Sequence, residues 1–149
     1  MHGGRESGAR TDTVAAVERQ LVSSGSPWEL VVGYSRAVRV DDRVWVAGTS
    51  PQWPDGSVDP DVGVQTRRCF EIIEAALAEA GCSLEDIVRT RLYIVDVQDF
   101  DAVKRVHGEL LGDVRPACTG LVVAGLLDPR WKVEIEADAV RPTERAPFA

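Results

Sequence analysis

The residues of this chain whose types could do chemistry are few, and Glu134 is the first of them. It lies in the alternating residues 132–140, whose acidic positions would share one face of a strand. A carboxylate there could act as a general acid/base, or could be exposed and pair with Arg89 or Arg91. Tyr34 could hydrogen-bond a ligand or pack at an interface. The sequence leaves both pairs of alternatives open.

Metal chemistry and the common nucleophilic motifs find no support in the sequence. It has two histidines, at positions 2 and 107, and its three cysteines form no CxxC pair. We therefore expect no metal site, and without a GxGxxG, Walker or GxSxG motif we expect no cofactor. No histidine is placed in the sequence to activate Cys118, which favours a small inert residue over a nucleophile. We expect His107 on the polar side of a helix.

The composition is that of one acidic domain. The chain has 149 residues, of which 44% are hydrophobic, and its formal net charge is −7. Because this charge repels phosphate backbones, it disfavours nucleic acid as a partner. No apolar window is long enough for a membrane span, and the unpaired cysteines favour a reduced, cytoplasmic protein with no membrane partner. We expect a flexible extension over residues 1–21, one domain over residues 22–141 and a tail over residues 142–149.

The candidate residues must be positioned by strands and helices that follow two different periods. Apolar residues three and four apart predict helices over residues 62–80 and 99–111, and a weaker helical stripe covers residues 13–21. The Pro- and Gly-rich residues 49–61 predict a surface loop. The β-rich runs predict strands at residues 35–40, 43–47, 88–95, 119–126 and 132–140.

The expected architecture is α+β, a mixed β-sheet with two helices packed on one face. The first two strands and the last two are each expected to form a hairpin. Two helices can cover only one face of such a sheet, so the other face must meet water or a second subunit. Oligomerisation is the simplest way to cover it.

Several short segments appear along the chain in a recognisable order. They are Gly33-Tyr34-Ser35-Arg36-Ala37, Val46-Ala47-Gly48, Gln65-Thr66, Ala80-Gly81, Arg115-Pro116-Ala117 and Val133-Glu134-Ile135-Glu136-Ala137. In order and spacing, over residues 28–141, they resemble the reactive intermediate deaminase family (RidA, also called YjgF). The resemblance implies a chorismate-mutase-like fold and a homotrimer with three ligand clefts between subunits. In active members, such clefts hydrolyse enamine or imine products of PLP enzymes, such as 2-aminoacrylate, to 2-keto acids and ammonia.

The resemblance also implies roles for individual residues. Glu134 matches the acid that positions water, which makes it the expected catalytic residue, and Ala47 replaces a serine of the family pattern. The expected substrate-binding residues are Tyr34, Gly48, Cys118, Thr119 and Gly120.

One departure from the family pattern affects substrate binding directly. The family's substrate-clamping arginine follows Pro-Ala, and here Pro116-Ala117 is followed by Cys118. An arginine binds a carboxylate through two charge-assisted hydrogen bonds, whereas a neutral thiol offers one weak donor. A substitute cation could come from another direction, and the candidates are Arg36, Arg89, Arg91 and Arg115.

Three functions follow from these residues. The first is a divergent RidA-like homotrimer that binds a small metabolite between subunits and hydrolyses an enamine or imine through Glu134. The second is a non-catalytic ligand-binding or scaffolding trimer that kept the clefts without the arginine. The third is an endoribonuclease or translation inhibitor, which the acidic charge disfavours unless Arg36, Arg39 and Arg43 form a local basic patch.

Overall fold

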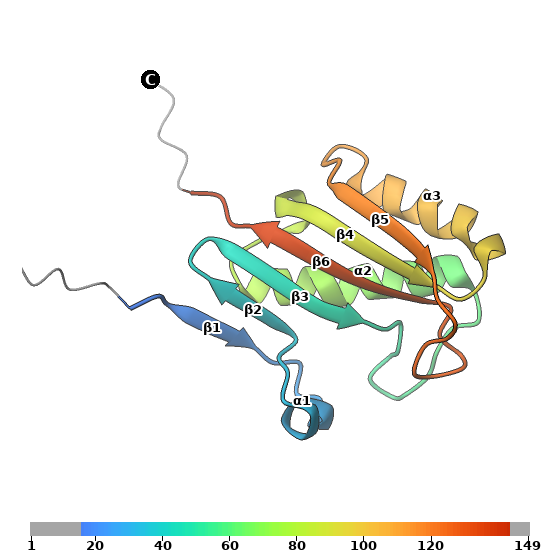
Figure 1. Ribbon diagram of the computed structural model, residues 1–149, viewed down its shortest axis with the longest axis horizontal. Coiled ribbons are helices and arrows are strands. Elements are labelled where there is room, and N and C mark those ends of the chain that lie inside the picture. The colour runs from blue at the N-terminus through green and yellow to red at the C-terminus, as the bar shows by residue number, and fades with distance from the viewer. Residues whose placement is uncertain (1–15, 144–149) are drawn as a thin grey trace, which may run out of the picture.

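Alternating buried and exposed residues build a mixed six-stranded sheet in the computed structural model, which describes residues 16–143 (Figure 1). The strand order is β1-β2-β3-β6-β4-β5. The strands are β1 (Arg19–Val22), β2 (Ala37–Val40), β3 (Arg43–Thr49), β4 (Ile87–Ile94), β5 (Ala117–Val122) and β6 (Val133–Val140). The helices are α1 (Pro27–Val32), α2 (Val62–Glu79) and α3 (Phe100–Leu111).

The core lies between one face of the sheet and the two long helices, α2 and α3, as the sequence predicts. Val44, Leu92 and Ile135 from three central strands are buried against Phe70 and Leu77 of α2. Burial of side chains this large contributes roughly 1.5–3 kcal/mol each, so this face fixes the register of the sheet. The opposite face has no helix over it in the described part of the chain.

The ends of α2 follow the expected local chemistry. Asp61 caps its first turn by accepting a hydrogen bond from the backbone N–H of Val64, at 2.9 Å. Gly81 follows the helix with a φ of 79°, a left-handed conformation that glycine adopts without strain. The predicted helix over residues 62–80 and the turn after it are therefore confirmed.

The predicted second hairpin is wrong. Strand β6 lies between β3 and β4 and is antiparallel to both, while β5 pairs in parallel with β4 at the edge of the sheet. Two β-rich runs around a turn motif favour a hairpin, but the connection over residues 123–132 is long enough to carry the chain past β4. This topology separates residues that the sequence places close together.

The start of the described chain also differs from expectation. Residues 19–22 are strand β1, paired with β2, instead of the expected helical stripe, because pairing to a sheet edge outweighs a weak local preference. Strand β1 crosses the expected domain boundary at residue 22. Helix α1 was not predicted, although Ser26 caps it, Pro27 starts it and Gly33 ends it with a φ of 82°. The remaining expected extension, residues 1–15, and residues 144–149 of the expected tail lie outside the described residues.

Among residues 16–143, no helix is both long and apolar enough to cross a membrane.

Candidate functional site

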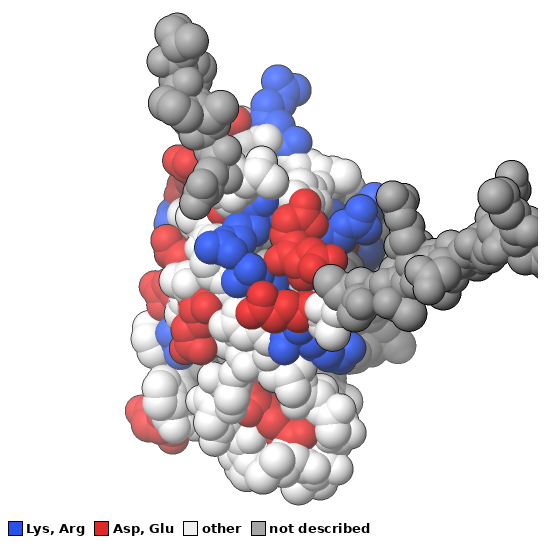
Figure 2. Space-filling view, turned by 90° about the vertical axis from the view of Figure 1, so that its left-hand side faces the viewer, with Lys and Arg blue, Asp and Glu red and all other residues white. Residues whose placement is uncertain are grey.

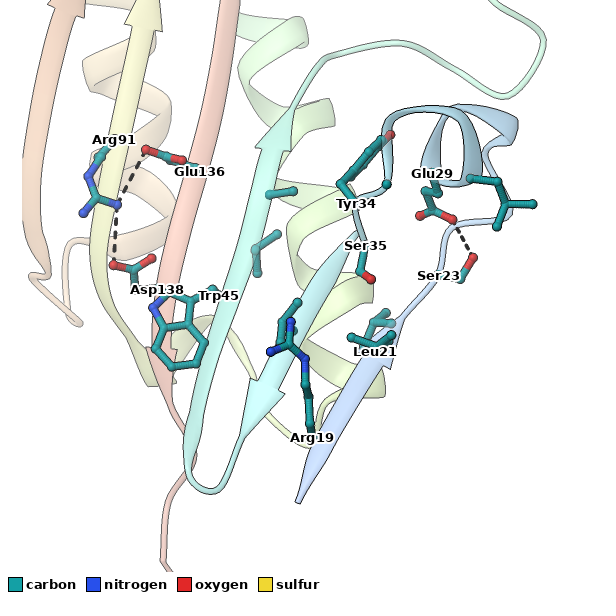
Figure 3. Close-up of a pocket in the computed structure, with 16 residues that line it drawn as sticks. Arg19, Leu21, Ser23, Glu29, Tyr34, Ser35, Trp45, Arg91, Glu136 and Asp138 are labelled. Atoms are coloured by element: carbon teal, nitrogen blue, oxygen red, sulfur yellow. Dashed lines mark hydrogen bonds and ion pairs between the residues drawn. The ribbon is translucent and has the colours of Figure 1, made fainter. Parts of the chain in front are cut away.

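The sheet face away from the helices is hollowed by an open concavity of about 860 Å³. Its walls come from β1, α1, β2 and β3, and charged side chains of β4 and β6 lie at its far end (Figure 3). Tyr34, Trp45 and Ala47 line it, and Figure 3 shows Tyr34 and Trp45 from different walls. Of the residues predicted to form the site, Tyr34 is therefore the one that reaches this concavity in a single described chain.

The charged side chains at the far end of the concavity form ion pairs with one another. Arg91 lies 3.6 Å from a carboxylate oxygen of Glu136 and 3.5 Å from one of Asp138. The Tyr93 hydroxyl donates to Glu136 at 2.6 Å. Arg91 is therefore committed to these two acids, and no ion pair between Arg91 and Glu134 is found among the described residues. The alternative in which Glu134 is a surface acid paired with Arg91 loses its support.

Glu134 lies over Gly48 instead. A β-bulge between Val46 and Thr49 breaks the pairing of β3 with β6 and brings the Gly48 backbone under the acid. A Cβ atom at position 48 would lie 2.5 Å from Glu134 Oε1, closer than any van der Waals contact. The glycine is thus required for Glu134 to lie where it does.

Glu134 is half-buried, and this burial raises the pKa of its carboxyl above the ordinary value. The nearby positive charge of Arg36 opposes the rise in pKa, and the negative charge of Glu136 adds to it. A carboxylate with a raised pKa accepts a proton more readily than an exposed one, which favours a general acid/base role.

Arg36 lies at the same end of the sheet. Its Nη2 donates to the backbone carbonyls of Ala47 at 2.6 Å and Gly48 at 2.7 Å, which are the carbonyls of the bulge. Its Nε is buried and has no hydrogen-bond partner. Burial lowers the pKa of the Arg36 guanidinium, and the groups that oppose this include Tyr34, Glu29 and Glu134. Arg36 is therefore a partly desolvated cation among polar groups of the site.

Tyr34 is held in place by a loop that sequence reasoning missed. The Glu29 carboxylate, which is buried, accepts hydrogen bonds from the Ser23 hydroxyl at 2.6 Å and from the Ser24 backbone N–H at 3.0 Å (Figure 3). The Glu29 carbonyl accepts the backbone N–H groups of Gly33 and Tyr34. Glu29 thus ties β1 to the end of α1, just before Tyr34. An acid five and six residues after two serines carries no signal in the sequence that would identify this role.

The other predicted binding residues lie on the edge strand β5, away from Glu134. Cys118, Thr119 and Gly120 are all exposed. In the register, Tyr93 of β4 stands between Glu134 of β6 and Leu121 of β5. Two strand spacings, roughly 10 Å, therefore separate Glu134 from β5. A single chain does not bring the two predicted halves of the site together.

The residues on β5 also point to different faces of the sheet. Cys118 pairs in register with Thr90, which is buried on the helix side. Gly120 faces the same side, where a Cβ atom would lie 2.8 Å from the Phe100 ring. Gly120 is therefore explained by close packing of α3, whatever its role in ligand binding. Thr119 pairs with Arg91 and faces the concave side.

His107 is packed rather than placed on the polar side of its helix. One ring nitrogen lies 2.9 Å from the Thr90 hydroxyl, and the ring meets Phe70 edge-on. Burial lowers the pKa of His107, which favours its neutral form. The expectation that His107 lies on the polar side of its helix is therefore wrong. The sequence did not indicate that Thr90 of β4 would pack against that side of α3.

Metal-ligating residues do not cluster in residues 16–143, where no group of three or more His, Cys, Asp or Glu side chains could hold an ion. The three cysteines are free, with Cys69 and Cys82 buried and Cys118 exposed. Burial raises the pKa of Cys69 well above its ordinary value, and its thiol donates to the Thr49 carbonyl. Cys69 is therefore a structural support beneath the bulge.

Comparison with known proteins gives consistent matches over this same part of the chain. A family model described as Endoribonuclease L-PSP matches residues 16–141. The protein SCO2049 of Streptomyces coelicolor is 45% identical over 132 residues, covering 87% of this chain and 96% of that protein. A 3-aminoacrylate deaminase, RutC of Acinetobacter baylyi, is 31% identical over 121 residues, covering 80% and 94%.

Solved structures agree with the sequence matches. The crystal structure of Rv2704 from Mycobacterium tuberculosis, described as a member of the YjgF/YER057c/UK114 family, has 44% sequence identity and a TM-score of 0.76. The match covers 83% of this chain and 99% of the other.

Proposed function

The chain belongs to the Endoribonuclease L-PSP family, which contains the RidA, YjgF and RutC proteins, and from this membership we propose that it hydrolyses an enamine or imine of a small metabolite. The α+β fold expected for this family is confirmed by the match to its solved structures. The observation that carries the proposed activity is the half-buried Glu134 over Gly48, with a raised pKa and a cation nearby.

Glu134 acts on water and on the leaving nitrogen. Water adds to the imine carbon, forming a C–O bond as the Glu134 carboxylate accepts its proton. The carboxyl returns this proton to nitrogen, which gives a carbinolamine. The carbinolamine hydroxyl then passes its proton through the same carboxylate to nitrogen as the C–N bond breaks, and a keto compound and ammonia leave. An enamine reaches the same path after proton transfer to its carbon. The raised pKa of Glu134 makes its carboxylate a stronger proton acceptor than that of an exposed glutamate, which supports its action on water.

We propose that assembly completes the site, in a homotrimer whose clefts lie between copies. The supporting observation is apolar surface left exposed in the single chain. Trp28, Leu30 and Val31 of α1 are 64%, 93% and 74% exposed, and every residue of β5 is exposed. Such apolar surface is typical of an interface. In the assembly, Cys118, Thr119 and Gly120 from one copy form the neutral wall of a cleft whose acid is the Glu134 of another.

A non-catalytic ligand-binding trimer is the second candidate. It is favoured by Cys118, because the exposed thiol after Pro116-Ala117 brings no positive charge to β5. Such a protein would bind a small metabolite in the same clefts without turning it over. The two candidates differ in whether a keto compound and ammonia are released.

Cleavage of RNA is the least supported function, although the matching family model carries that description. The face seen in Figure 2 mixes acidic and basic side chains without a continuous basic surface. Arg36 is bound to bulge carbonyls, and Arg39 donates to the Asp41 carbonyl at 2.9 Å. Arg39 lies within β2, whereas Arg36 lies in the bend before it and donates to the bulge carbonyls instead.

Release of keto acid from enzymatically generated 2-iminopropionate and 2-iminobutyrate tests the proposal. We expect the native chain to exceed spontaneous hydrolysis, and Glu134→Gln to lower kcat at least about 100-fold, the usual scale of one general acid/base. Cys118→Arg is the comparison variant, since it restores the family's cation without touching Glu134. Native turnover at the spontaneous rate would reject catalysis on these substrates and favour the ligand-binding trimer.

A further inference from the structure

We infer that Arg36 is the anion-binding residue of this site and holds the carboxylate of an α-imino or α-keto acid. This inference rests on the proposed function, since it names the substrate group that the same site recognises. It places the cation within the subunit that supplies Glu134, instead of on the edge strand that carries Cys118.

The first observation is the unused hydrogen-bonding capacity of Arg36. A guanidinium carries five N–H donors in a planar fork. Two bonds from Nη2 reach the Ala47 and Gly48 carbonyls, which fix the plane of the fork, while the buried Nε has no partner. No hydrogen bond from Nη1 is found within residues 16–143. Both Nη2 protons are used and Nε is buried, so Nη1 is the donor left for a ligand, and a carboxylate oxygen there would add a charge-assisted hydrogen bond.

The second observation is the spacing between Arg36 and Glu134. The two groups are close enough for each to influence the other's protonation, yet they are not within ion-pair distance of one another. Both lie against Gly48: Arg36 Nη2 donates to its carbonyl, and Glu134 Oε1 occupies the place that a Cβ at position 48 would need. An α-imino acid has its carboxylate on the carbon next to the reacting one. With that carboxylate on Arg36, the reacting carbon lies on the Glu134 side.

The third observation concerns the other arginines near the sheet. Arg91 lines the concavity together with Arg19, and Arg91 is held by Glu136 and Asp138. Arg130 is held by Asp128, outside the concavity. Among the described arginines with a place in the site, Arg36 is therefore the one whose hydrogen bonds go to neutral carbonyls. Its charge is not cancelled by a direct acidic partner.

The proposal predicts a preference for charge in the ligand. Titration calorimetry compares 2-ketobutyrate with its uncharged amide, 2-ketobutyramide, on the native chain, Arg36→Gln and Arg89→Gln. We expect the native chain to bind the acid at least about tenfold more tightly than the amide, a factor typical of one hydrogen-bonded charge pair. Arg36→Gln should bind the two equally, and Arg89→Gln, a matched loss of one arginine on β4, should keep the preference.

A second measurement does not depend on the stability of Arg36→Gln, which loses two bonds to the bulge. In the native chain, the Nε–Hε nuclear magnetic resonance signal of Arg36, assigned with Arg36→Lys, should shift with 2-ketobutyrate and stay in place with the amide. The proposal is overturned if the native chain does not prefer the acid, if Arg36→Gln keeps the preference, or if this signal does not respond.

These outcomes are separate from those of the hydrolysis assay. If Arg36 selects the carboxylate but no keto acid is released above background, the anchor holds and the proposed catalysis fails. If keto acid is released while Arg36→Gln keeps its preference for the acid, catalysis holds and the anchor fails.

Discussion

The bulge end of β3 and β6 and the edge strand β5 carry the two halves of one expected site, but they are built differently. At the bulge, Glu134 is half-buried over Gly48, and Arg36 is fixed by two backbone carbonyls. On β5, Cys118 and Thr119 are exposed and neutral. The first region holds an acid and a cation in fixed positions within one chain, whereas the second is an exposed strand edge.

The difference follows from the position of each strand in the sheet. Strand β6 has a partner on each side, so its outer side chains are held by those of β3 and β4. Strand β5 has one partner, and its free edge leaves backbone groups available to another chain. Side chains that need a fixed position and a shifted pKa for catalysis are therefore expected at the bulge. Side chains that only shape the wall of a cleft are expected on β5.

The largest effect on activity is expected from a variant that disturbs the bulge without disturbing the fold. In Gly48→Ala the new Cβ displaces Glu134 Oε1, which is the flexible end of a side chain, so activity should suffer far more than stability. We expect kcat for 2-iminobutyrate hydrolysis to fall about 100-fold, the effect of roughly 1 Å of misplacement.

Gly108→Ala is the matched control for that variant. A Cβ at position 108 meets open space on α3, and alanine favours a helix over glycine by about 0.5–1 kcal/mol. It should raise the midpoint of thermal unfolding slightly and leave kcat unchanged. Equal kcat losses in Gly48→Ala and Gly108→Ala would show that the bulge has no special role.

A smaller effect should appear in the pH dependence of stability. The folded pKa of Glu134 is raised by burial, so the ionised carboxylate destabilises the fold above that pKa, and the penalty disappears below the unfolded value, about 4.3. Glu134→Gln removes the charge and should add up to about 1 kcal/mol of unfolding free energy at pH 7, after allowance for solvent screening. That gain should vanish as the pH falls below about 4.

Urea unfolding of both chains at pH 7 and pH 4 measures this difference. Glu74→Gln, which removes an exposed carboxylate of α2, is the control and should show little change at either pH. A native chain that is more stable than Glu134→Gln at pH 7 would mean that Glu134 is stabilised by a partner instead of poised for chemistry.

Local signals in the sequence predicted what is local in the structure. The apolar period of α2 and the Gly81 that follows it are determined by residues a few positions apart. The capping box of Ser83 and Asp86 is present for the same reason. The alternation of β6 placed Glu134 on the polar face with Glu136 and Asp138, and the family resemblance singled it out from these acids.

The parts that the sequence could not predict depend on long-range pairing. Strand β5 is paired with β4 and not with β6, and no residue near the turn at Asp128 determines that choice. The approach of Arg36 to Gly48 depends on the bulge in β3, where one extra residue redirects the chain. Arg36 was one of several candidate cations, and the sequence alone could not predict that it lies near Glu134.

The central claim is that the two regions form one site only when one copy's bulge meets another copy's β5. Co-expression of Glu134→Gln with Cys118→Trp, each inactive alone, tests this in mixed oligomers. With equal, random assembly, about a quarter of the sites combine an intact Glu134 from one copy with an intact Cys118 from its neighbour. The account predicts hydrolysis of 2-iminobutyrate at about that fraction of the native rate. Mixed oligomers that form but stay inactive would contradict a site shared between copies.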